Sequence, residues 1–118
     1  MGVDINPGHA CWAYGGFARF REALAEEEGL KLRSMEGYGG ELSWEHVNTT
    51  LAPLLNHSDC DGFLSPWDCK DMLPRLREIR HKWRDLGYVD RAYDVGQMGQ
   101  LIYGMEHCVE HRCAVVFS

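Results

Sequence analysis

The chain has 118 residues, of which 45% are hydrophobic and 25% charged, and this size and composition predict one soluble domain over residues 1–118. The 12 Lys and Arg against 18 Asp and Glu give a formal net charge of −6, which argues against a nucleic-acid partner because such a partner needs a basic face. The 5 cysteines lack a CxxC pair and predict a reducing cytoplasm, and no apolar run approaches the roughly 18 residues that span a membrane.

The first quarter of the chain predicts a strand, a loop and a helix. Alternating apolar residues indicate a short strand over residues 1–5. Proline and glycine occur repeatedly in residues 6–16, which we expect to form an aromatic loop. An apolar stripe at helical spacing then predicts a helix over residues 16–28, closed by Gly29 just after its last turn.

The middle of the chain predicts irregular backbone followed by a long helix. Residues 31–50 show no period, and we expect one helical turn at 43–46 at most. Ser65 is a favourable N-cap for a second helix, and Pro66 suits its first position. Because Pro74 removes a backbone donor inside this helix, we expect a kink or split there.

The last part of the chain predicts a third helix over residues 89–111 and a strand over 114–117 that pairs with the first strand. Glycines in this helix lower its propensity by about 1 kcal/mol each and indicate close packing, either within the chain or against a second copy in a homo-oligomer. The predicted fold class is therefore α+β, with three main helices and a short two-stranded sheet from the termini.

The run LNHSDCDGFLSP at residues 55–66 raises the question of a metal site. Aligning its glycine with that of a twelve-residue calcium loop places His57, Asp59, Asp61 and Asp68 at ligand positions. Carboxylate oxygens suit calcium, whereas the imidazole nitrogen and the short Asp68 side chain suit it less. We therefore treat calcium as an alternative cofactor for the 57–68 loop.

Two other interpretations of the same run stay open. His57, Asp59 and Asp61 are also ligands for a transition metal, which would make the protein a small metal-dependent phosphohydrolase. The run is equally typical of a turn in which the Asp side chains bond the backbone and Gly62 supplies a positive φ before the Ser65 cap.

A second group of polar and aromatic residues predicts a ligand site. His9, Trp12 and Tyr14 precede the helix over 16–28, and the aromatic rings would form a wall on which a flat ligand stacks. We expect Asn56, from the second polar loop, to join this surface.

Two stretches, residues 1–25 (MGVDINPGHACWAYGGFARFREALA) and 54–69 (LLNHSDCDGFLSPWDC), resemble a family of small proteins from bacteria and their phages. Its members share a Met-Gly-x-Asp start followed by a His and a Trp, and a Leu-Leu-x-His-Ser-Asp-Cys-Asp-Gly run. The resemblance covers about a third of the chain. It implies a setting in the cytoplasm of a bacterial host cell, and it implies no activity.

These observations predict a non-enzymatic binding protein of phage or prophage origin. In one version it is an accessory or counter-defence protein that sequesters a small nucleotide signal, and in another it blocks a host protein. The small size, the acidic charge and the two polar loops favour this prediction over an enzyme, because the sequence carries no complete catalytic set. The calcium-binding protein and the metal-dependent phosphohydrolase are the alternatives.

Overall fold

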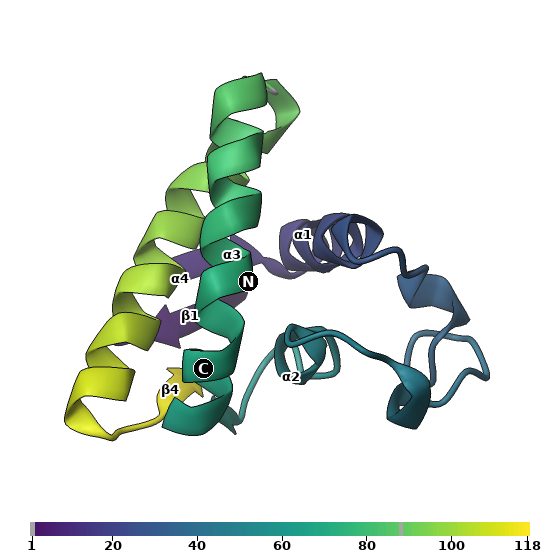
Figure 1. Cartoon of the computed structure of the whole chain (residues 1–118), viewed down its shortest axis with the longest axis horizontal. Coiled ribbons are helices and arrows are strands. Elements are labelled where there is room, and N and C mark those ends of the chain that lie inside the picture. The colour runs from purple at the N-terminus through teal and green to yellow at the C-terminus, as the bar shows by residue number, and fades with distance from the viewer. Residues whose placement is uncertain (1, 88) are drawn as a thin grey trace.

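The structure is a computed structural model that describes residues 2–87 and 89–118. It confirms an α+β domain with three main helices (Figure 1). The helices and strands are, in chain order, β1 (Gly2–Asn6), β2 (Ala10–Ala13), α1 (Tyr14–Glu27), α2 (Ala52–Leu55), β3 (Phe63–Leu64), α3 (Pro66–Leu86), α4 (Ala92–His111) and β4 (Val115–Phe117). Three 3₁₀ turns complete the fold: η1 (Leu32–Ser34), η2 (Trp44–His46) and η3 (Val89–Arg91).

The sheet is antiparallel, with the strand order β2-β1-β4-β3. The predicted pairing of the terminal strands is confirmed, since Ile5 lies opposite Phe117 in the β1–β4 ladder. The sheet nevertheless has four strands rather than the two expected. Part of the predicted aromatic loop forms β2, in which Trp12 faces the core, and the end of the 55–66 run forms β3. Strands this short show too few alternations to be recognised as strands in a sequence.

The helices follow their predicted positions closely. Helix α1 begins at Tyr14, two residues earlier than expected, and α4 is preceded by the η3 turn. The cap of α3 is confirmed, because the Asp68 backbone N–H donates to Ser65 Oγ at 3.1 Å. The expected split does not occur, and α3 is continuous through Pro74. Pro74 is exposed, so water can satisfy the carbonyl that lacks its intrahelical donor.

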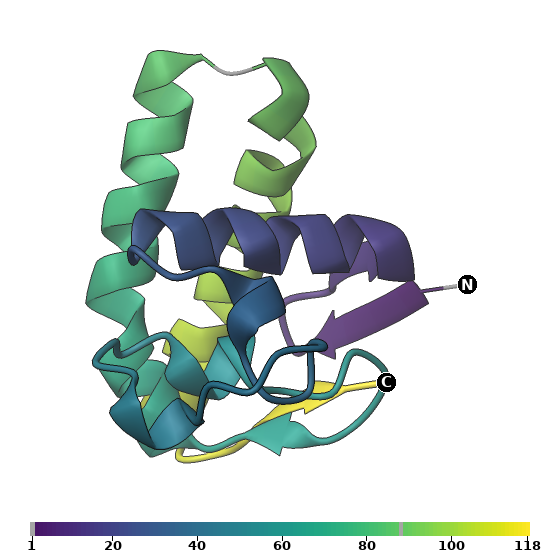
Figure 2. The ribbon, with the colours of Figure 1, turned by 90° about the vertical axis from the view of Figure 1, so that its right-hand side faces the viewer.

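Helices α3 and α4 lie side by side, and α1 crosses them (Figures 1 and 2). The sheet packs towards the end of this pair that is far from η3 (Figure 2). Aromatic rings join the layers: Trp12 of β2 stacks on Phe20 of α1 at 4.5 Å, and Phe20 meets Trp83 of α3 edge-on at 6.3 Å. Among the described residues, no helix has both the length and the apolar character needed to cross a membrane.

Two of the three glycines of α4 serve packing within the chain, whereas Gly96 has no heavy atom of the described residues, beyond the adjacent helix backbone, within 4 Å of the position a Cβ would take. A Cβ on Gly104 would lie 2.7 Å from the backbone nitrogen of Gly8, in the turn between β1 and β2. A Cβ on Gly99 would lie 2.9 Å from the guanidinium of Arg80 on α3. Close approach within the chain therefore explains these two positions.

Candidate functional site

The 55–66 run forms a turn that is organised around the His57 ring. Its Nδ1 lies 2.8 Å from Ser58 O and its Nε2 lies 3.1 Å from Phe63 O, so the ring lies between the two ends of the turn and, when neutral, donates its one N–H to one of these carbonyls. The ring also stacks on Phe117 of β4, with centroids 4.1 Å apart. Gly62 has a φ of 96°, as the turn interpretation expects.

The four predicted metal ligands occupy different surroundings. His57 holds the turn, whereas Asp68 lies in the first turn of α3, next to the Ser65 cap. Within residues 2–87 and 89–118, no group of three or more His, Cys, Asp or Glu side chains is placed to hold a metal ion. The calcium and transition-metal alternatives stay predictions.

A buried arginine lies beside this turn. Arg21, on α1, is 3% exposed, and its Nη1 donates to the carbonyl oxygen of His57. The guanidinium lies over the ring of Phe17 at 4.6 Å and beside that of Tyr38 at 5.4 Å. Its Nε is buried and has no hydrogen-bond partner in the structure. Arg21 is thus a cation with an unused donor.

The electrostatics of Arg21 reflect its burial. Desolvation lowers the pKa of Arg21, while the nearby Tyr38 and Asp59 act in the opposite direction. A guanidinium nevertheless stays protonated in proteins, so the buried charge persists. Arg21 therefore needs anionic or carbonyl oxygens around it.

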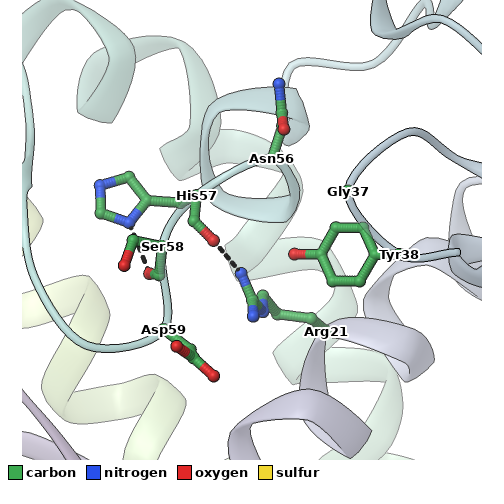
Figure 3. A pocket seen from close by; sticks show the side chains of 7 residues that line it. All are labelled: Arg21, Gly37, Tyr38, Asn56, His57, Ser58 and Asp59. Carbon is green, nitrogen blue, oxygen red and sulfur yellow. Dashed lines mark hydrogen bonds between the residues drawn. The ribbon is translucent and has the colours of Figure 1, made fainter.

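Arg21 forms the floor of an open pocket of about 360 Å³ (Figure 3). The pocket is lined by Arg21, Gly37, Tyr38, Asn56, His57, Ser58 and Asp59. Figure 3 shows the guanidinium between the Tyr38 ring and the Asp59 carboxylate, below the His57 carbonyl. The Asn56 side chain points away from the guanidinium in the same view. Three separate segments of the chain therefore meet at this pocket.

Tyr38 is fixed in place by its hydroxyl, which donates to Leu55 O at 2.6 Å. Burial raises the pKa of Tyr38, although the charge of Arg21 opposes this, so the hydroxyl stays a donor at neutral pH. Trp44 packs against the Tyr38 ring at 6.2 Å, and its indole N–H donates to Glu36 O at 2.9 Å. These contacts hold part of residues 31–50 in place, a segment whose apolar residues show neither helical nor strand periodicity.

The residues expected to bind a ligand divide into two groups. Asn56 lines the pocket, together with two predicted metal ligands, His57 and Asp59. His9, Trp12 and Tyr14 do not line it. His9 is exposed in the β1–β2 turn, and Tyr14 is 36% exposed at the start of α1.

Trp12 occupies a core position rather than a surface one. Its side chain is 2% exposed, and its indole N–H donates to Asp94 Oδ1 at 2.9 Å. Because one face of the ring stacks on Phe20, a ligand that stacked there would have to displace core packing. Burial raises the pKa of Asp94, although the hydrogen bond from Trp12 acts to lower it.

Arg21 and Tyr38 are the pocket residues that sequence reasoning missed. Arg21 lies on the apolar stripe of α1, one residue after Phe20 and three before Leu24, and all three side chains are buried. A charged residue on an apolar helix stripe was therefore the available signal. Tyr38 carried no comparable signal.

Comparison with protein-family models, with curated proteins and with solved structures finds no match to this chain.

Proposed function

We propose that the protein is a non-enzymatic binding protein, of phage or prophage origin, that holds a small phosphate-bearing ligand of the nucleotide class in the Arg21 pocket. The observation that carries this proposal is the buried Nε of Arg21, which has no partner. An unsatisfied buried donor costs about 1–3 kcal/mol, and more when it is charged. Arg21 also lines the pocket, so a phosphate oxygen bound there would accept a charge-assisted hydrogen bond from the guanidinium. A cavity of this kind favours a small ligand over the blocking of a host protein.

The other pocket residues favour a ligand that carries hydrogen-bond donors as well as an anion. The Asp59 carboxylate only accepts hydrogen bonds when ionised, and it lies close enough to influence the charge of Arg21. A bare anion would be repelled by it, whereas a nucleotide offers sugar hydroxyls and base amino groups. The cavity of about 360 Å³ lies within the range of roughly 300–1,000 Å³ that is usual for small-molecule sites.

The His57 ring supports binding rather than catalysis. Both of its nitrogens face backbone carbonyl oxygens, at 2.8 and 3.1 Å, so the ring is already engaged in holding the turn. A general base needs a free nitrogen within reach of the substrate proton. The pocket therefore offers recognition groups without a free imidazole base.

The proposal is tested by thermal unfolding and calorimetry with ADP-ribose, AMP and cyclic dinucleotides, each compared with adenosine, which lacks phosphate. We expect at least one phosphorylated ligand to raise the Tm while adenosine leaves it unchanged. Arg21→Gln should abolish this binding. Arg19→Gln is the matched control, because Arg19 is exposed on the same helix.

The proposal is overturned if none of the phosphorylated ligands shifts the Tm, or if Arg19→Gln weakens binding as much as Arg21→Gln. If Arg21→Gln does not fold, Asp59→Asn serves as the second variant, because Asp59 is exposed. Removing this carboxylate should raise the affinity for inorganic pyrophosphate and lower that for the nucleotide. An unchanged affinity for both would also contradict the proposed pocket.

A further inference from the structure

Three cysteines gather where α4 ends. Cys69 on α3 and Cys108 in the last turns of α4 are fully buried, and Cys113, two residues before β4, is partly buried. The Cys113 thiol donates to Cys108 Sγ, with the two sulfurs 3.1 Å apart. Cys11 and Cys60, the remaining cysteines, are exposed.

The backbone holds the two sulfurs in contact. Arg112 adopts a left-handed conformation, with φ 54°, which ends α4 and turns the chain back over its last turn. The Cys113 N–H then donates to Cys108 O at 3.0 Å. Because the chain reversal itself places Cys113 against Cys108, the contact does not depend on one side-chain rotamer alone.

We propose that Cys108 and Cys113 are a modification site: an oxidisable dithiol that small-molecule disulfides such as glutathione disulfide convert into a reversible intramolecular disulfide. The bond would join the last turn of α4 to the segment that enters β4. This site is separate from the Arg21 pocket and stands independently of the proposed function.

The reaction is a pair of thiol–disulfide exchanges. The Cys113 thiolate attacks one sulfur of glutathione disulfide, the S–S bond of that molecule breaks, and one glutathione leaves as the thiolate. Cys108 then loses its proton and attacks the Cys113 sulfur of the mixed disulfide, which displaces the second glutathione. Two protein thiols are oxidised, one glutathione disulfide is reduced to two glutathione thiols, and these take up the two protons.

Burial decides the order of events. Cys113 is partly exposed whereas Cys108 is buried, so Cys113 meets the small molecule first. Burial raises the pKa of Cys69 to about 12 and that of Cys108 to about 12, so neither starts the exchange. Cys108 acts in the second step because its sulfur already contacts Cys113. Arg112, next to Cys113, and Lys70 line an open surface pocket whose charge suits the carboxylates of glutathione.

The chain allows the bond to be mapped directly. Trypsin cleaves after Arg112, so Cys108 and Cys113 fall on different peptides, 92–112 and 113–118. Cys69 falls on a third peptide, 34–70, together with Cys60. We expect the native protein, incubated with glutathione disulfide and digested under non-reducing conditions, to yield peptide 92–112 linked to 113–118. Dithiothreitol should separate them, and the intact Cys11→Ser/Cys60→Ser variant, which lacks the two exposed thiols, should lose about 2 Da on oxidation.

Matched variants identify the sulfurs. Cys113→Ser should abolish the loss of mass, and no glutathione should attach to Cys108 or Cys69 in this variant. Cys69→Ser should oxidise as the native protein does. A Cys11→Ser/Cys60→Ser variant removes the two exposed thiols and should still form the linked peptides. The proposal is overturned if the linked pair is absent, if peptide 34–70 carries the bond through Cys69, or if Cys113→Ser oxidises normally. The mapping of the native protein holds even if a variant does not fold.

Discussion

The α3–α4 hairpin and the loop region, defined as residues 31–62, both bury apolar side chains, but the loop region also depends on long-range hydrogen bonds from side chains to the backbone. The hairpin buries apolar side chains along two long helices, among them Leu76 and Met98, both 0% exposed. The loop region has one short α-helix and two 3₁₀ turns. It adds buried side chains to the core, among them Leu51 and Leu54, both 0% exposed. Hydrogen bonds from large side chains to distant backbone carbonyls complete it: Tyr38 donates to Leu55 O within the region, and Arg21 of α1 donates to His57 O.

The difference explains why the candidate site lies in the loop region. Close apolar packing leaves little room for a ligand and few polar groups to recognise one. A polar loop that crosses a rigid helix brings donors and acceptors from separate segments to one place, as Arg21, Tyr38 and Asp59 show. Helix α1 thus supplies the cation Arg21, and the loop region supplies the other residues that line the pocket.

The largest effect should come from breaking the hairpin core. Leu76→Ala removes a fully buried side chain from the α3–α4 contact, and we expect it to lower the free energy of unfolding by about 2–5 kcal/mol. Leu86→Ala is the matched control on the same helix, because Leu86 is 53% exposed and should cost about 0.5 kcal/mol or less. Urea unfolding measures both. Equal losses would contradict the assignment of the core.

A smaller effect should come from cutting one hydrogen bond of the loop region. Tyr38→Phe keeps the ring but leaves Leu55 O without its donor, and we expect a loss of about 1 kcal/mol. Tyr103→Phe, at a residue that is 64% exposed, should leave the stability unchanged. Urea unfolding of both variants tests whether this single bond holds the segment. A loss as large as that of Leu76→Ala would contradict the assignment of a single hydrogen bond to the Tyr38 hydroxyl.

The difference between the hairpin and the loop region also explains which parts of the structure could be predicted from the sequence. The stripe of α3 that includes Leu73, Leu76 and Ile79 repeats at helical spacing, and all of it is buried. The cap of α3 was likewise predicted, because Ser has a dominant local use at the start of a helix. The β1–β4 pairing was expected because the sequence analysis predicted one strand at each end of the chain.

The pocket could not be predicted in the same way. The bond from Tyr38 to Leu55 joins residues 17 positions apart and depends on a backbone path that no periodicity encodes. The sequence analysis did not single out Arg21, whose guanidinium lies over Phe17 and beside Tyr38, a residue of a different segment. Asn56 was expected at a binding surface because it lies in a polar loop. Arg21 and Tyr38, which line the same pocket, come from other parts of the chain.

The smallest effect on the Tm is expected from adding calcium, zinc or manganese. Elemental analysis measures the metal content of the purified protein. The calcium alternative predicts a rise in Tm that Asp59→Ala with Asp61→Ala removes, whereas the turn organised by His57 predicts no change. Asp71→Ala with Asp90→Ala is the control, since it makes the same charge change at exposed positions.

A metal-dependent rise lost in the first pair and kept in the control pair would restore the 57–68 loop as a metal site. Hydrolysis of a phosphodiester that a chelator stops and metal restores would then favour the phosphohydrolase alternative. A metal bound there would also have to share Asp59 with the Arg21 pocket, so metal and nucleotide would influence each other's binding. An unchanged Tm with every metal would leave Asp59 free for ligand recognition and the His57 ring as the element that holds the turn.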